Sequence, residues 1–300
     1  MQLPNSLGAF MKIQELYKEL GKTEKVLIIA TALLLLITLL LTAPFTRVFY
    51  STAIMSVYSA RCKEDSLLVS ENISLSIPGG LSTFKSDWFP FVMTFHPGRD
   101  FGYSVKKDCS LTILYNFPAF SPVKGCSRLF DPESAYYSSF YGAYLVKSEA
   151  APYGFITDDG GKIIGIHEED TAEVAKFDYK TLVLADFGLS YKDFVFDFKA
   201  TNRQSGVRYA ESDGWFLIDA EMTVSGCAHQ KGPFVQSYLQ YGIPAYGFEE
   251  AFAPTKMYGR MYGKYIEEKK TSIFFYIIAK SPEVLEECDE AILSKSTLEY

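Results

Sequence analysis

Histidine is scarce in this 300-residue chain, and its three copies are far apart. They are His96, His167 and His229, so the close histidine spacing of common zinc sites is missing. The five cysteines form no CxxC pair and no Cys/His ligand spacing, which are the usual signs of structural zinc. We therefore predict no metal site and no other cofactor.

Local signatures of catalysis are missing as well. The chain has no GxSxG elbow, no HExxH and no phosphate-binding loop. Ser-x-x-Lys begins at residues 82, 104 and 121, but the SDN and KTG that accompany it in penicillin-recognising enzymes do not follow. Residues 184 to 190, LADFGLS, spell the metal-binding segment of protein kinases, yet every partner motif is lacking. The sequence thus names no reaction.

An excess of positive charge is also lacking. Lysine and arginine total 29 against 36 acidic residues, a net charge of −7 at pH 7. An acidic protein of this kind has no basic surface for phosphate backbones. We predict no nucleic-acid partner, and we expect anionic lipid to repel the bulk of the acidic domain.

Charge disappears completely between residues 26 and 46, where the sequence is VLIIATALLLLITLLLTAPFT. A helix of that length reaches about 31 Å, close to the thickness of the hydrocarbon core of a bilayer. The run is longer than the apolar part of most signal peptides, and Pro44 follows its one small-residue cleavage triplet. The sequence therefore favours an uncleaved transmembrane anchor that contacts the lipid bilayer through residues 26 to 46.

Lysine near this run predicts its orientation. Lys12, Lys18, Lys22 and Lys25 precede it, whereas Arg47 alone follows it closely. The positive-inside rule then places the N-terminus in the cytoplasm and the C-terminal domain outside the cell membrane.

Four segments follow from these predictions. They are a short amphipathic cytoplasmic tail (1 to 25), the anchor (26 to 46), a juxtamembrane helix with a polar linker (47 to 71) and an extracytoplasmic α+β domain (72 to 300). The tail fits either a helix lying in the membrane interface or a short solvated helix, and both alternatives stay open.

The large domain is rich in phenylalanine and tyrosine, with 24 and 21 copies in the chain, which favours strands. Alternation and apolar runs predict strands at residues 73 to 77, 89 to 95, 101 to 105, 111 to 117 and 194 to 198. Residues 153 to 167 predict a hairpin around Asp158-Asp159-Gly160-Gly161. A second hairpin, residues 207 to 224, turns at residues 211 to 214. Residues 136 to 146 fit a strand or a helix, and Asp170 is expected to cap a short helix through Ala175.

The C-terminal segment carries the clearest local signals after the anchor. Residues 272 to 279 are almost continuously apolar, which predicts a central strand covered on both faces. Ser281 suits an N-cap and Pro282 the first helical position. The apolar positions that follow share one helical face; they are Val284, Leu285, Cys288, Ile292 and Leu293. The predicted fold is thus one N-terminal transmembrane helix and an α+β domain on antiparallel sheet, closing with a strand and a C-terminal helix.

Two clusters are candidate sites. Tyrosine and glycine are dense between residues 238 and 265, a composition typical of binding surfaces, and we select Tyr246, Tyr258, Tyr262 and Tyr265 as binding residues. The densest titratable cluster is His167, Glu168, Glu169 and Asp170. It suits a general base, a Ca²⁺ site with the hairpin aspartates, or a solvated hairpin end.

Two modifications are also suggested. Cys109 and Cys126 flank a predicted hairpin and could form a disulfide, or both could remain buried thiols. The single sequon, Asn72-Ile73-Ser74, is an acceptor for N-glycosylation in a source that glycosylates proteins.

Two functions remain open. The first is a single-pass membrane protein that displays an extracytoplasmic domain for binding or assembly with a protein partner. The second is a membrane-tethered extracytoplasmic hydrolase that uses acidic residues, since such catalysts leave little local signature.

Overall fold

The computed structural model of the chain describes residues 20–42, 60–78, 93–95, 99–118, 120–121, 126–127, 133–180, 194–226 and 253–300. The chain divides into two compact units, Met1–Arg47 and Val48–Tyr300. Residues 1–19 of the expected tail and residues 47–59 of the expected juxtamembrane helix lie outside the described residues.

The first unit contains helix α2, Lys22–Thr42. Glu24 lies in its first turn, where the side-chain carboxylate accepts a hydrogen bond from the Gly21 amide at 2.8 Å. Ten large apolar side chains between Val26 and Leu39 are exposed along this helix. The predicted anchor overlaps α2 from residue 26 onward, and residues 43–46 lie outside the described residues. Within the described part of the chain, no helix meets the combined length and apolarity expected of a membrane span.

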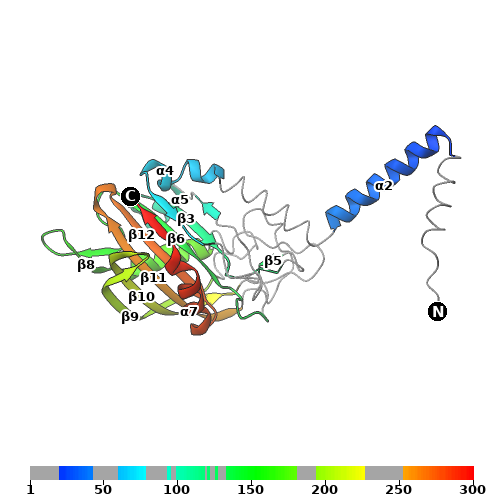
Figure 1. Ribbon diagram of the computed structural model, residues 1–300. Helices are drawn as coiled ribbons and strands as arrows, with labels where there is room; N and C mark the ends of the chain where they lie inside the picture. The colour runs from blue at the N-terminus through cyan, green and yellow to red at the C-terminus, as the bar shows by residue number, and fades with distance from the viewer. Residues whose placement is uncertain are drawn as a thin grey trace. The chain divides into compact units, whose positions relative to one another are not determined.

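The second unit is built on a seven-stranded sheet in which every described pair of neighbours is antiparallel. The strand order is β2-β3-β6-β12-β11-β10-β9 (Figure 1). In that order the bounds are Met93–Phe95, Cys109–Asn116, Phe140–Ser148, Thr271–Ala279, Pro254–Ile266, Ser212–Ser225 and Phe196–Tyr209. The predicted α+β domain on antiparallel sheet is confirmed, and residues 140–146 of the ambiguous segment belong to strand β6.

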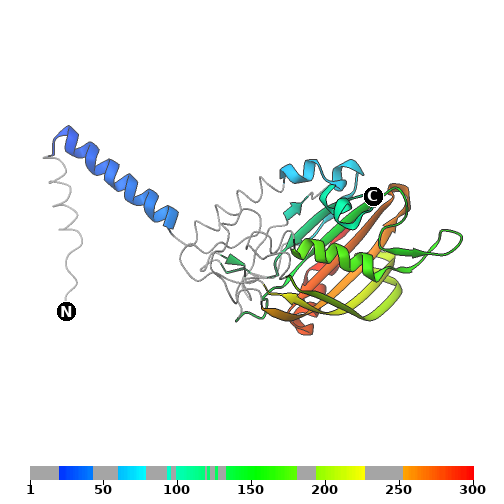
Figure 2. The same cartoon turned by 180° about the vertical axis from the view of Figure 1, so that it is seen from behind.

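Strand β12 is the centre of the sheet, as its apolar run predicted. All nine residues from Thr271 to Ala279 are buried. Helix α7 (Pro282–Ala291) packs on one face of the sheet and helix α6 (Glu168–Asp178) covers the other, as the two opposite views in Figures 1 and 2 show. The side chains on both faces of β12 are therefore shielded from water. This explains why apolar and polar residues do not alternate along the strand.

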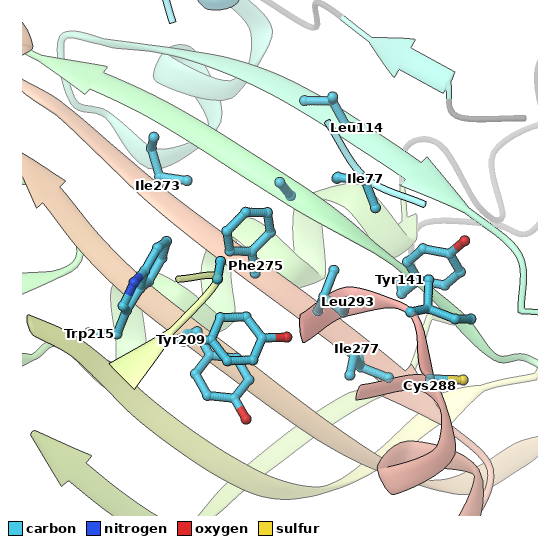
Figure 3. Packing of buried hydrophobic residues seen from close by; sticks show 14 of the residues in the cluster. Ile77, Leu114, Tyr141, Tyr209, Trp215, Ile273, Phe275, Ile277, Cys288 and Leu293 are labelled. Atoms are coloured by element: carbon cyan, nitrogen blue, oxygen red, sulfur yellow. The ribbon is translucent and has the colours of Figure 1, made fainter. Parts of the chain in front are cut away.

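Helix α7 confirms the prediction for the C-terminal segment. The Ser281 hydroxyl accepts a hydrogen bond from the Val284 amide at 3.3 Å, and Pro282 is the first helical residue. The helix is followed by a 3₁₀ turn, η6 (Leu293–Lys295). The apolar residues of α7, together with Ile292 and Leu293 just after the helix, are buried against Ile277 and Phe275 of β12 (Figure 3). Strand β13 (Thr297–Glu299) then pairs with β1 (Ser74–Ser76) in a separate two-stranded sheet.

Helix α6 begins earlier than predicted. His167, and not Asp170, is its N-cap, and the helix runs to Asp178. The physical reason is that the His167 ring nitrogen accepts the Asp170 amide at 3.3 Å, so the acidic residues occupy the first helical turn, where the helix dipole favours them.

Both predicted hairpins are present. Strands β7 (Phe155–Thr157) and β8 (Ile163–Ile166) pair across the Asp-Asp-Gly-Gly turn. Strands β9 and β10 turn at Ala210 and Glu211, both with positive φ, one residue before the predicted turn. Gly214, with φ of 84°, lies where the register between the two strands shifts.

One predicted strand is wrong. Residues 99–105 form helix α5, Arg99–Val105. Phe101, Tyr103 and Val105 fit a strand by alternation, but Phe101 is buried while Tyr103 is 89% exposed. Phe101 packs edge-to-face on Tyr153 and Phe177, so tertiary contact decides the helix over local alternation.

The short elements complete the unit. The interval expected as a polar linker contains helix α4 (Leu67–Ser70), whose first two leucines are buried in the core, so the folded part includes residues before 72. Strands β4 (Phe120–Ser121) and β5 (Cys126–Ser127) pair with each other. A 3₁₀ turn, η5 (Glu267–Lys269), joins β11 to β12.

Candidate functional site

The acidic cluster, residues 167 to 170, lies at the start of helix α6. Most of its side chains form ion pairs or cap the helix. Glu168 pairs with Arg203 of β9, and Asp170 accepts a hydrogen bond from the Lys107 ammonium at 2.6 Å. His167 caps the helix, and Glu169 is exposed. The cluster therefore orients and fastens the N-terminal end of α6. Among the described residues, no group of three His, Cys, Asp or Glu side chains is placed to hold a metal ion.

The predicted binding tyrosines have different surroundings. Tyr246 lies outside the described residues. Tyr262 is buried, and its hydroxyl donates to Asp289 at 2.6 Å. Tyr265 is half-buried, with its ring 6.2 Å from that of Phe155. Tyr258 is half-buried, and the Lys256 ammonium lies 5.2 Å from its ring centre. Of the three described tyrosines, Tyr262 thus belongs to the core and offers no surface.

Packing on the two faces of β11 explains why tyrosine alternates with glycine there. Tyr262 points to the face covered by α7, where it stacks on Tyr209 at 3.5 Å. Gly263 faces the other side, where an added Cβ would lie 2.8 Å from Ile166 Cδ1 and 3.0 Å from the Phe274 ring. Since real Cβ contacts are not that close, glycine is required for the close approach of β8 and β12.

Cys109 is a free thiol, so of the two alternatives that the sequence left open for this residue it has the second and not the disulfide with Cys126. Strand β3 pairs along its length with β6, which places Cys109 opposite Ser148. Burial raises the pKa of the Cys109 thiol to about 11, although the nearby Lys107 opposes that shift. A thiol with a raised pKa is a poor nucleophile at neutral pH. Cys288 is buried and free, in agreement with the prediction for α7.

A cluster of charges fastens helix α7 to the sheet, and sequence analysis did not detect it. The Arg260 guanidinium of β11 donates to Asp219 of β10 at 2.7 Å and to Asp289 of α7 at 2.9 Å. It also binds both carboxylate oxygens of Glu286. Tyr209 donates to Asp289 at 2.7 Å. These partners are 26 to 80 residues apart in sequence, so no local pattern could have signalled them.

A second group missed from the sequence is the carboxyl of Asp178, which lies in the core. Asp178 is fully buried at the end of α6, and its Oδ2 accepts the Tyr144 hydroxyl at 2.6 Å. Its Oδ1 has no hydrogen-bond partner. Burial raises the pKa of Asp178 to about 7, although hydrogen bonds from Tyr144 and Tyr276 oppose the shift. From the sequence alone, an aspartate at the end of a helix is expected to be exposed to solvent. Only its buried position in the fold reveals the raised pKa.

The hairpin formed by β7 and β8 is the candidate functional site. Its base is buried, where Phe155 stacks on Phe274 with ring centres 5.5 Å apart. Its arm projects beyond the sheet, as the views in Figures 1 and 2 agree. On this arm Ile156 is 44% exposed and Ile164 is 56% exposed. The sequence predicted the hairpin, but period-two alternation could not tell which apolar side chains stay outside.

The turn of this hairpin is held rigidly. The Asp158 carboxylate accepts the Gly160 amide at 3.0 Å and the Lys162 amide at 2.9 Å. At the base, the His167 amide donates to the Gly154 carbonyl at 2.7 Å. The two isoleucines are therefore presented on an ordered arm, with Asp159 exposed at its tip. Apolar side chains on such an arm can enter a cleft with little loss of conformational entropy.

Comparison with protein-family models, with curated proteins and with solved structures gives no match to this chain.

Proposed function

We propose that this chain is a single-pass membrane protein whose acidic α+β domain lies outside the cytoplasm and binds a protein partner. In this proposal residues 26 to 46 cross the bilayer, the N-terminus is cytoplasmic, and the β7–β8 hairpin contacts the partner. The observation that carries the binding function is the exposure of Ile156 and Ile164 on a projecting, rigid arm.

The uncharged run supports the anchor. Its 21 residues would reach about 31 Å as a helix, which matches the hydrocarbon core of a bilayer. Helix α2 includes residues 26 to 42 of this run, and the exposed apolar side chains on it are suited to lipid. Helical backbone also satisfies its own hydrogen bonds, which a membrane interior requires.

Charge supports the orientation. Four lysines lie in the 25 residues ahead of the run, and a single arginine follows it closely. Lysine and arginine near a span are retained on the cytoplasmic side.

Exposed isoleucines support recognition of a protein. Single exposed apolar side chains are common on soluble surfaces, but two on one ordered hairpin can each enter a cleft of a partner. The acidic tip would be repelled by anionic lipid, which favours a protein partner over the membrane surface.

Topology can be tested with intact cells that express the full chain with a tag at each end. Added protease should remove the C-terminal tag and leave the N-terminal one. The chain should also stay in the membrane fraction after a carbonate wash. A protected C-terminal tag would contradict the orientation, and release by carbonate would contradict the anchor.

Binding can be tested with a photo-crosslinking residue at position 164 of the full chain in native membranes. We expect a discrete adduct that disappears when Ile156 is changed to Asp. The matched control places the same crosslinker at position 103, on the exposed Tyr103 of α5. Equal adducts from both positions, or an adduct unaffected by the Ile156→Asp change, would contradict a binding role for the hairpin.

A further inference from the structure

The turn between α4 and β1 carries the one Asn-x-Ser/Thr sequon of the chain, Asn72-Ile73-Ser74. Such a sequon is an acceptor for N-linked sugar only where its asparagine is accessible outside the cytoplasm. This turn lies wholly within the described residues, and Asn72 is exposed on it.

The backbone of the turn is fixed by hydrogen bonds and by one buried side chain. The Asn72 amide donates to the Val69 carbonyl at 3.2 Å, and the Ile73 amide donates to the Leu68 carbonyl at 2.8 Å. Ile73 itself is buried in the core. Asn72 has φ of 52°, in the left-handed region that asparagine tolerates better than most residues. The conformation therefore suits asparagine at this position.

The side chains of the sequon remain available. The Asn72 carboxamide makes no hydrogen bond in the described structure, and Ser74 is exposed at the start of β1. The neighbouring Glu71 carboxylate forms an ion pair with the Lys147 ammonium at 2.9 Å, and it does not bind the Asn72 carboxamide. A group attached to Asn72 Nδ2 would leave this ion pair and the buried Ile73 in place.

We propose that Asn72 is a site of N-linked glycosylation, an inference that rests on the extracytoplasmic placement of the domain in the proposed function. In the transfer, a bond forms between Asn72 Nδ2 and C1 of a lipid-pyrophosphate-linked oligosaccharide. The bond between that C1 and the pyrophosphate oxygen breaks, the lipid pyrophosphate leaves, and an amide proton passes to a base of the transferase. Ser74 supplies the hydroxyl that the sequon requires.

The test is translation of the full chain in the presence of eukaryotic microsomes, followed by electrophoresis with and without a peptide N-glycosidase. The unaltered chain should show one upward shift in apparent mass that the glycosidase removes. Asn72→Asp and Ser74→Ala should each abolish the shift. Asp tolerates the left-handed backbone, and Ser74 is exposed, so neither change should prevent folding.

A control variant separates this inference from the placement on which it rests. Lys199→Asn creates a second sequon with Ala200 and Thr201 at an exposed position of β9. With Asn72 modified, this variant should show two shifts. Suppose instead that the Lys199→Asn variant shows a single shift, and that this shift remains when Asn72→Asp is added. That result would overturn the assignment of Asn72, but it would still support the extracytoplasmic placement of the domain. No shift in any variant would overturn both the assignment and the extracytoplasmic placement.

Discussion

The Tyr144 hydroxyl donates a hydrogen bond of 2.6 Å to the Asp178 carboxylate inside the core. Tyr144 also stacks on Tyr276, with ring centres 4.0 Å apart. The carboxyl at the end of α6 is therefore held between the helix and strands β6 and β12. Removing a carboxylate from water favours its neutral form, which accounts for the raised pKa.

The first prediction concerns the pH dependence of stability. The pKa of Asp178 is raised from 3.8 to about 7 in the folded domain. Between these values the folded domain keeps a proton that the unfolded chain has lost, so the free energy of unfolding falls as the pH rises. At 1.36 kcal/mol per pKa unit, the loss between pH 4 and pH 8 is about 4 kcal/mol.

Asp178→Asn removes this titration, so the variant should lose less stability over that interval than the parent. Urea unfolding of the full chain in detergent, followed by tryptophan fluorescence, measures both pH dependences, and Trp215 is a buried reporter. Other titrating groups are common to the two proteins. Parallel curves for parent and variant would show that Asp178 titrates normally.

The second prediction concerns Arg260. Arg260→Met removes the shared partner of Asp219, Glu286 and Asp289, and leaves the buried Asp289 without a cation. Breaking a buried ion pair from one side typically costs about 3–5 kcal/mol. The matched control is Lys256→Met, which removes an exposed pair with Glu221 and should cost under about 1 kcal/mol. Similar losses in urea unfolding for the two variants would argue against the fastening role of Arg260.

The third prediction separates two tyrosines of β11. Tyr262→Phe deletes a hydroxyl bonded to the carboxylate of Asp289 and should cost about 1.5–3 kcal/mol. Tyr258→Phe changes a half-buried ring beside Lys256 and should change stability by less than about 0.5 kcal/mol. Thermal unfolding of both variants measures the two losses of stability. A larger loss at position 258 than at position 262 would contradict the assignment of Tyr262 to the core.

The fourth prediction concerns two glycines with positive φ, Gly154 just before the hairpin and Gly161 in its turn. An added Cβ at Gly154 would lie 2.6 Å from the Phe274 ring, whereas nothing lies within 4 Å at Gly161. Gly154→Ala should combine backbone strain with overpacking and cost about 2–5 kcal/mol. Gly161→Ala should cost about 1–2 kcal/mol from strain alone. Equal melting temperatures for the two variants would contradict the close contact.

The fifth prediction concerns the attachment of α7. Leu293→Ala removes a fully buried side chain just after the helix and should cost about 2–5 kcal/mol. Removing residues 281–300 should unfold the domain, because total stability is usually only about 5–15 kcal/mol. A truncated chain with an unchanged melting transition would refute this role for the segment.

The sequence by itself determined those elements whose signals are local. Ser281 and Pro282 start α7, the Asp-Asp-Gly-Gly turn sets the β7–β8 hairpin, and the unbroken apolar run gives β12. Capping, turn geometry and side-chain periodicity act within a few residues of the chain, so they can be read without knowledge of the fold.

Only the tertiary structure decided which side chains meet. Phe101 lies in a helix because Tyr153 and Phe177 pack against it. The perturbation of Asp178 depends on Tyr144, 34 residues away, and Tyr209 is 80 residues from its partner Asp289. Burial and pairing of this kind depend on strand order and helix placement, which short-range patterns do not encode. The core role of Tyr262 and the exposure of Ile164 therefore followed from the fold alone.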